Sequence, residues 1–139
     1  MKEEEIKEFK IVVVASKFEK DCYEDLMRPA TRLFDLLHHE DPSRKRFKFV
    51  HNGVKTGPLG EFLKLLNVME NGMRPRGYFV QREQHKMDLV LNGPESEAKW
   101  VKENAEGADI IFVINDGKLK KNVREAVEQA DVYAMEIDI

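Results

Sequence analysis

The chain has 139 residues with a formal net charge of −3, and 35% of its residues are charged while 42% are hydrophobic. This length and composition predict a single domain over residues 1–139, and the acidic balance argues against a nucleic-acid partner, which calls for a strongly basic protein. One cysteine, Cys22, excludes an intrachain disulfide and fits a reducing, cytoplasmic location, and no apolar run is long enough to cross a membrane.

The first elements are a charged lead-in, a strand and a helix. Residues 1–8 are charged, and we expect a frayed start rather than a signal peptide. Residues 9–15 are β-branched and apolar nearly throughout, which is typical of a central strand in a parallel sheet. At about residues 21–39, apolar side chains recur at spacings of three and four, which predicts a helix. Pro29 either kinks this helix or marks the first turn of a shorter one.

The middle of the chain predicts two more strands around a second helix. Residues 47–51 indicate a short buried strand. The next helix is expected at about residues 58–71, opening with proline and ending with Gly72 as its C-cap. A third strand begins at residues 78–80. Residues 89–91 are either one extra short strand or irregular loop.

The last part predicts two helices and two strands. A third helix is expected from Gly93-Pro94 to about residue 106, followed by the clearest buried strand at residues 108–114. A final helix starts at about residue 118, and residues 132–137 alternate as an edge strand would. Alternating strands and helices predict a Rossmann-like α/β three-layer sandwich, with a mostly parallel five-stranded sheet and helices on both faces.

Glycines, lysines and hydroxyl groups follow the predicted strands. Ligands of open parallel sheets bind outside the carboxyl ends of the strands, near the point where strand order reverses. If the order is 3-2-1-4-5, the ends of the first, second and fourth strands surround one crevice. Loop amides and a helix N-terminus suit an anion, and lysine suits phosphate. The candidate ligand-binding residues are Ser16, Lys17, His51, Asn52, Gly53, Lys55, Thr56, Gly57, Gly93, Asn115, Asp116, Gly117 and Lys118.

Other chemistry finds less support. No Gly-x-Gly-x-x-Gly or Gly-x-x-x-x-Gly-Lys-Ser/Thr motif is present, no spacing predicts a metal site, and we expect no cofactor. A triad of Ser16, His51 and Asp116 has no geometric support from the sequence. His51 could contact a phosphate or ribose, or cap its own loop. Trp100 is expected in the core or an interface, and His85 has no evident partner.

These strand-end segments resemble the SLOG superfamily of Rossmann-like nucleotide binders, most closely its small YspA-like branch. Residues 15–17, Ala-Ser-Lys, are similar to Gly-Ser-Arg in that branch. Residues 51–58, His-Asn-Gly-Val-Lys-Thr-Gly-Pro, resemble its His-Gly-Gly-Ala-x-Gly-Ala-Asp segment. Residues 93–97 correspond to Gly-Pro-x-Arg-Asn, and residues 108–113 to an Ala-Asp-hydrophobic strand. The similarity covers most of residues 9–137.

The chain also departs from that pattern. Ser96 and Glu97 replace the Arg-Asn pair, residues 116–120 keep only part of a Gly-Gly-x-Gly-Thr loop, and Val123 stands where related phosphoribohydrolases place a catalytic glutamate. The resemblance therefore implies binding of a nucleotide or nucleotide-derived molecule, phosphate-bearing and ADP-ribose-like, more readily than catalysis.

Three functions remain open on the sequence. The first is a sensor or sequestering protein for such a small molecule. The second is an enzyme that cleaves or transfers an N-glycosidic bond, with Glu95, Glu97 or Asp116 as its carboxylate. The third is a protein-interaction module with an exposed apolar patch at Trp100 or at residues 78–79. A homo-oligomer is compatible with all three.

Overall fold

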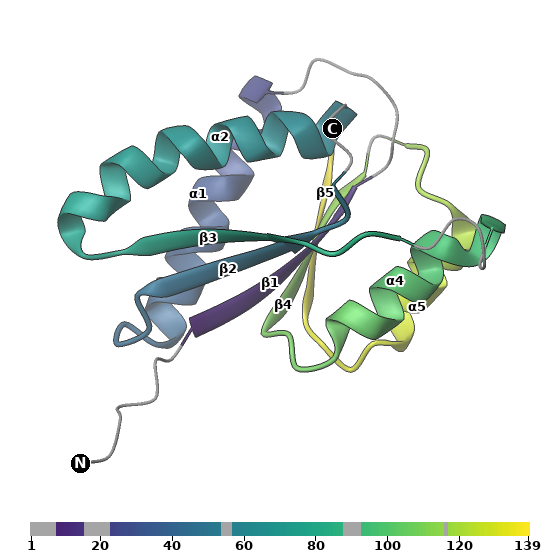
Figure 1. The fold of residues 1–139 in the computed structure, drawn as a ribbon. Coiled ribbons are helices and arrows are strands. Elements are labelled where there is room, and N and C mark those ends of the chain that lie inside the picture. Colours follow the sequence, from purple (N-terminus) through teal and green to yellow (C-terminus); the bar gives the residue numbers. More distant parts are fainter. Residues whose placement is uncertain (1–7, 16–22, 54–56, 88–92, 116) are drawn as a thin grey trace, which may run out of the picture.

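A computed structural model of the chain describes residues 8–15, 23–53, 57–87, 93–115 and 117–139. They contain a five-stranded sheet in the order β3-β2-β1-β4-β5, with every neighbouring pair parallel (Figure 1). The predicted Rossmann-like α/β class is confirmed, and the edge position of the last strand is confirmed with it. The strands are β1 (Glu8–Ala15), β2 (Arg46–His51), β3 (Phe79–Gln84), β4 (Ile110–Asn115) and β5 (Ala134–Asp138).

Helices cover both faces of this sheet (Figure 1). Helices α1 (Tyr23–Glu40) and α2 (Gly57–Met73) lie on one face, and the 3-10 turn Arg74–Arg76 follows α2. Helices α4 (Ser96–Ala105) and α5 (Lys121–Gln129) lie on the other face and pack against each other. A second 3-10 turn, Gly93–Glu95, leads into α4. The extra strand considered at residues 89–91 lies outside the described residues.

The side chains on the two faces of β1 belong to two separate hydrophobic cores. Phe9, Ile11 and Val13 are buried beneath α1 and α2, whereas Val12 and Val14 are buried beneath α4 and α5. Successive side chains of a strand point to opposite faces, so a strand covered on both sides reads as one continuous apolar run. This explains why residues 11–15 form an unbroken apolar run.

Aromatic rings hold α2 against the sheet. The ring of Phe62 lies 5.1 Å from that of Phe112 in β4 and 5.8 Å from that of Phe49 in β2, measured between centroids. All three side chains are fully buried. Ring pairs at these separations stabilise by about 0.5–1.5 kcal/mol beyond the area that they bury. The start of α2 is therefore held firmly beside the carboxyl ends of β2 and β4.

The end of α2 differs from the prediction. Gly72 is not its C-cap, because the helix continues through Gly72 without a positive φ and its 3-10 extension ends at Gly77. Gly77 has a φ of 87°, and its N–H donates to the carbonyl of Arg74 at 3.0 Å. The N–H of Tyr78 donates to the carbonyl of Met73 at 3.2 Å. This pair of bonds is a Schellman motif, which needs a left-handed residue at its centre.

Two other boundaries depend on packing. Pro29 lies inside α1, so the alternative of a shorter helix beginning at Pro29 is wrong. Leu26, Ala30 and Leu33 are fully buried around it, and this packing keeps the helix continuous despite the lost backbone hydrogen bond. The last helix begins at Lys121 instead of residue 118, so Lys118 precedes it.

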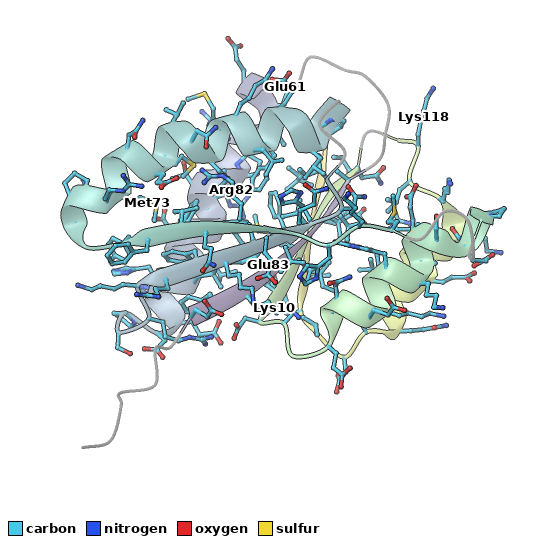
Figure 2. The ribbon with its side chains drawn as sticks, viewed as in Figure 1. Lys10, Glu61, Met73, Arg82, Glu83 and Lys118 are labelled. Atoms are coloured by element: carbon cyan, nitrogen blue, oxygen red, sulfur yellow. The ribbon has the colours of Figure 1, made fainter. Side chains whose placement is uncertain are left out.

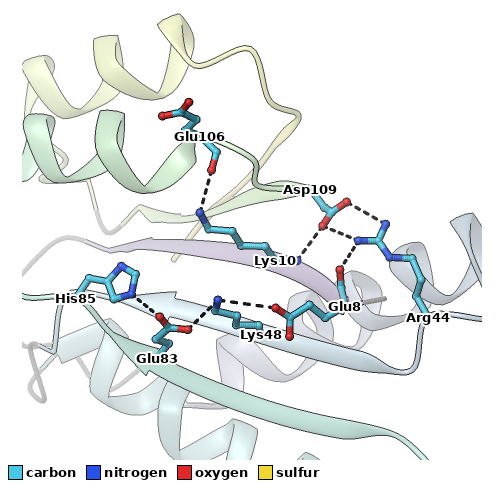
Figure 3. Close-up of polar contacts among 8 residues, drawn as sticks. All are labelled: Glu8, Lys10, Arg44, Lys48, Glu83, His85, Glu106 and Asp109. Atoms are coloured by element: carbon cyan, nitrogen blue, oxygen red, sulfur yellow. Dashed lines mark hydrogen bonds and ion pairs between the residues drawn. The ribbon is translucent and has the colours of Figure 1, made fainter. Parts of the chain in front are cut away.

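The amino ends of the central strands are closed by a polar network (Figure 3). The carboxylate of Asp109 accepts two bonds from the guanidinium of Arg44, at 2.9 and 3.0 Å, and one from the N–H of Lys10 at 2.8 Å. The Nζ atom of Lys10 donates to the carbonyl of Glu106 at 2.9 Å. Such two-pronged charged pairs fix geometry well. Asp109 thus ties β1 to β4 at the edge opposite the predicted ligand site.

Candidate functional site

The described candidate residues lie at the carboxyl edge of the sheet. His51 ends β2, Asn115 ends β4, and β1 lies between these two strands. Asn52 and Gly53 follow β2, Gly57 is the first residue of α2, Gly93 opens the turn before α4, and Gly117 and Lys118 follow β4. The remaining candidates lie outside the described residues: Ser16, Lys17, Lys55, Thr56 and Asp116.

The turn after β2 is tightly built around a glycine. Gly53 has a φ of 83°, and its N–H donates to Nδ1 of His51 at 3.1 Å. A Cβ atom on Gly53 would lie 2.2 Å from Nε2 of Gln84 at the end of β3. The N–H of His85 also donates to the carbonyl of His51 at 2.9 Å. The ends of β2 and β3 are therefore joined, and the positive φ at position 53 favours glycine there.

His51 is a buried, neutral side chain. Burial lowers its pKa below the ordinary value of 6.5, and the positive charges of Arg82 and His85 lower it further. Because Nδ1 accepts the Gly53 N–H, the neutral ring carries its proton on Nε2. Of the two roles considered for His51, the structure shows the cap of its own loop.

The turn after β4 is closed by Asn115. Its Oδ1 accepts the N–H of Gly117 at 2.8 Å, and Gly117 has a φ of 91°. Lys118 follows β4, and its exposed side chain extends outward from the ribbon (Figure 2). The backbone of this turn is thus set by an asparagine side chain and a left-handed glycine, as expected of an Asn-x-Gly turn.

The first turns of α4 and α5 carry an ion pair. Lys120 precedes α5 and makes no side-chain cap, and its Nζ lies 3.6 Å from Oε1 of Glu97 in α4. Glu97 is buried. Asn122 of α5 donates to the carbonyl of Pro94 at 3.2 Å and to the carboxylate of Glu95 at 3.3 Å. Both carboxylates considered for catalysis within the described part of the chain therefore engage polar groups at the start of α5.

A second polar cluster, which the sequence did not predict, lies beside β3 on the α4 side of the sheet (Figure 3). The carboxylate of Glu83 lies between two cations, 2.8 Å from Nζ of Lys48 and 2.7 Å from Nε2 of His85. Nδ1 of His85 is hydrogen-bonded to Oδ1 of Asn104. The indole Nε1 of Trp100 donates to the backbone carbonyl of His85 at 2.5 Å. The segment after β3 is thus attached to α4 by side chains.

This cluster favours a charged His85. Its pKa is raised above 6.5, chiefly by the hydrogen bond to Asn104 and then by the one to Glu83. Asn104 donates through Nδ2 to the carbonyl of Trp100 at 2.8 Å, which directs its Oδ1 toward His85. Both ring nitrogens therefore face acceptors, and only the imidazolium has two donors. The partners of His85, which were not evident from the sequence, are Glu83 at the end of β3 and Asn104 in α4.

Trp100 belongs to the core. Only 4% of its surface is exposed, so the Trp100 side chain itself offers no exposed apolar patch. Phe79, at the start of edge strand β3, is 53% exposed. Val123, which stands where related enzymes place a glutamate, lies in α5 and is fully buried.

Comparisons with known proteins add no relative. No family model matches the chain, and no curated protein is similar enough to count as a match. Within the described ranges, no group of three or more histidine, cysteine or carboxylate side chains could hold a metal ion. In the same ranges, no helix is both long and apolar enough to cross a bilayer.

Proposed function

We propose that this protein binds a small phosphate-bearing molecule, nucleotide-like or ADP-ribose-like, at the carboxyl edge of its sheet, and acts as a sensor or sequestering protein. The observation that carries the proposal is the position of the glycine turns. The turns after β2 and β4 both contain a left-handed glycine, and they flank β1 at the reversal of strand order. Parallel sheets bind ligands at such reversals.

The start of α2 supports an anionic ligand. This 17-residue helix begins at Gly57 with Pro58 next, and its first turn contains no acidic residue. The partial positive charge of its N-terminal amides is therefore not offset by a carboxylate of its own first turn. Lys118, beyond β4, adds a cation at the same edge of an acidic protein.

The described carboxylates favour binding over catalysis. An N-glycosidic cleavage needs a carboxylate that can reach the ribose. Glu97 is buried and forms an ion pair with Lys120, and Glu95 accepts a hydrogen bond from Asn122. Val123 stands where related enzymes have a glutamate and has no carboxylate. Asp116 lies outside the described residues. We therefore expect no release of free base when the protein is incubated with a nucleoside monophosphate, and sustained release would instead establish the enzymatic function.

Titration calorimetry tests the binding proposal. We expect saturable heat with ADP-ribose or AMP, and weaker or no binding of the matching nucleoside without phosphate. Lys118→Ala and Lys55→Ala should each weaken binding about tenfold, since a charged hydrogen bond contributes about 1.5 kcal/mol or more. Lys102→Ala at the far end of α4 is the control and should leave affinity unchanged. Absence of heat with every phosphate compound, or equal affinity in all three variants, would contradict the proposal.

A further inference from the structure

A separate cavity lies on the α1–α2 face, away from the carboxyl edge. It has a volume of about 260 Å³ and opens between α1, the end of α2 and the amino-terminal parts of β2 and β3. Met73, one of its lining residues, lies at the opposite end of the molecule from Lys118 (Figure 2). A ligand in this cavity would therefore not contact the turns of the proposed phosphate site.

The inner wall of the cavity is apolar and aromatic. Phe34 of α1 and Phe47 of β2 form an edge-to-face pair with centroids 4.9 Å apart, and both are buried. Met69 and Met73 of α2 pack against this core and are only partly buried. Methionine side chains adapt to different shapes, and apolar walls with a few polar groups are typical of small-molecule sites.

One side of the cavity is held in place by a hydrogen bond. The hydroxyl of Tyr78 is 2.7 Å from Nδ1 of His38, and the two rings meet edge to face at 5.5 Å. This contact joins α1 to the segment that follows the Schellman motif. The Tyr78–His38 contact therefore holds together two segments that line the cavity.

Two residues of opposite charge line this cavity. Asp35 comes from α1 and Arg76 from the 3-10 turn after α2. Neither side chain makes a hydrogen bond or ion pair with another residue in the described part of the chain. By contrast, the nearby guanidinium of Arg74 is paired with Glu70 at 2.5 Å. Both side chains are exposed to solvent, so both charges are accessible to a ligand that enters the cavity.

We propose that this cavity binds a small zwitterion with an apolar body, in chemical terms a free amino acid with an aromatic or large aliphatic side chain. The side chain contacts Phe34, Phe47 and the methionines, the carboxylate pairs with Arg76, and the ammonium group pairs with Asp35. The volume is below the roughly 300–1,000 Å³ of pockets for drug-sized ligands, which restricts the occupant to a molecule of this size.

Three related ligands test the assignment of charges. L-phenylalanine carries both groups, 3-phenylpropionate lacks the amine, and 2-phenylethylamine lacks the carboxylate. Binding is followed through the methyl resonances of Met69 and Met73, with the Trp100 indole N–H on the other face as an internal control. We expect L-phenylalanine to saturate the methyl shifts with a dissociation constant on the order of 1 mM or tighter, given the affinity that small ligands reach per atom. Each analogue should bind about fivefold more weakly, as expected for loss of one partly exposed ion pair.

Two variants give a crossed pattern that a nonspecific apolar site would not produce. Arg76→Ala should weaken the binding of L-phenylalanine and 3-phenylpropionate but leave the affinity for 2-phenylethylamine unchanged. Asp35→Asn should weaken the binding of L-phenylalanine and 2-phenylethylamine but leave the affinity for 3-phenylpropionate unchanged. Arg74→Ala and Asp25→Asn are the matched controls, because both residues are exposed and do not line the cavity.

Two results would overturn this proposal. One is the absence of saturable methyl shifts with L-phenylalanine up to about 10 mM, ten times the weakest constant expected. The other is equal affinity for all three ligands, or affinities that do not follow the crossed pattern in the variants. All four substitutions affect exposed side chains, so unfolding is not expected to obscure the outcome.

Discussion

Alanine substitutions at two neighbouring glycines should change the stability of this protein in opposite directions. Gly72 lies inside α2 without a positive φ, and a Cβ added there meets nothing within 4 Å. Gly77 has a φ of 87°, and its added Cβ meets only Nζ of Lys45 at 3.9 Å. Because neither methyl group makes a close contact, backbone conformation dominates both effects.

The magnitudes follow from that conformational difference. Gly72→Ala should raise the free energy of unfolding by about 0.5–1 kcal/mol, because alanine has the higher helix propensity and loses less freedom on folding. Gly77→Ala should lower it by about 1–2 kcal/mol, the cost of placing an L-residue in the left-handed region. The variants should therefore differ by about 1.5–3 kcal/mol, or about 5–12 °C in Tm for a domain of this size.

Urea denaturation of the two variants and the unmodified protein, combined with thermal scans, measures this difference. Equal dependence of the unfolding free energy on urea in all three would show that only stability has changed. If Gly72→Ala destabilised as much as Gly77→Ala, the helix would end at Gly72 as the sequence suggested. If Gly77→Ala were neutral, the Schellman motif would be wrong.

The remaining predictions concern α1 and the two histidines. Pro29→Ala should raise the free energy of unfolding by about 1 kcal/mol or more, because it restores a helical N–H, and urea denaturation would detect this; a loss of stability would contradict the reasoning. Asn104→Ala should lower the NMR-measured pKa of His85 toward 6.5 and lower the free energy of unfolding by about 1–3 kcal/mol. The control Asn67→Ala, at an exposed position, should change the free energy of unfolding by no more than about 0.5 kcal/mol. An unchanged pKa of His85 in Asn104→Ala would refute the hydrogen bond between them. The raised pKa of His85 means that its contribution to stability is complete below about pH 6.5 and is lost as pH rises through its folded pKa. The lowered pKa of His51 means the opposite, a contribution complete above about pH 6.5 and lost as pH falls. The stability difference between the unmodified protein and His85→Gln should shrink as pH rises above 6.5, and a constant difference would contradict the assignment.

The strands were predictable where local pattern and tertiary environment agree. Residues 11–15 and 110–114 are continuous apolar runs, and the structure buries both within central strands covered on two faces. The helix around residues 21–39 was predictable because its apolar stripe recurs at helical spacing and faces the sheet. In these segments burial alone selects the conformation.

Helix ends were less predictable. The choice between Gly72 and Gly77 depends on which glycine adopts a left-handed backbone, and both are followed by residues that permit a stop. The structure selects Gly77 because a 3-10 turn extends α2 by three residues before the chain enters β3. Pro29 illustrates the same competition, since packing of Leu26 and Leu33 outweighs the local cost of proline.

The polar clusters depended almost entirely on the fold. His85 is hydrogen-bonded to Asn104, which is 19 positions away, and Glu83 in β3 forms an ion pair with Lys48 in the neighbouring strand β2. No spacing within the sequence signals either contact. Similarly, Asp35 and Arg76 reach one cavity only because α1 and α2 lie side by side on the sheet.

By itself, the sequence determined the alternation of strands and helices, the layered α/β class and the edge at which glycine turns gather, because each of these follows from hydrophobic periodicity and backbone chemistry within a few neighbouring residues. The tertiary structure alone decided that the pKa of His51 is lowered and that of His85 raised, that Trp100 is core, and that a cavity exists between α1 and α2. Each of these features depends on distances between side chains far apart in the sequence, and only the packed fold sets such distances.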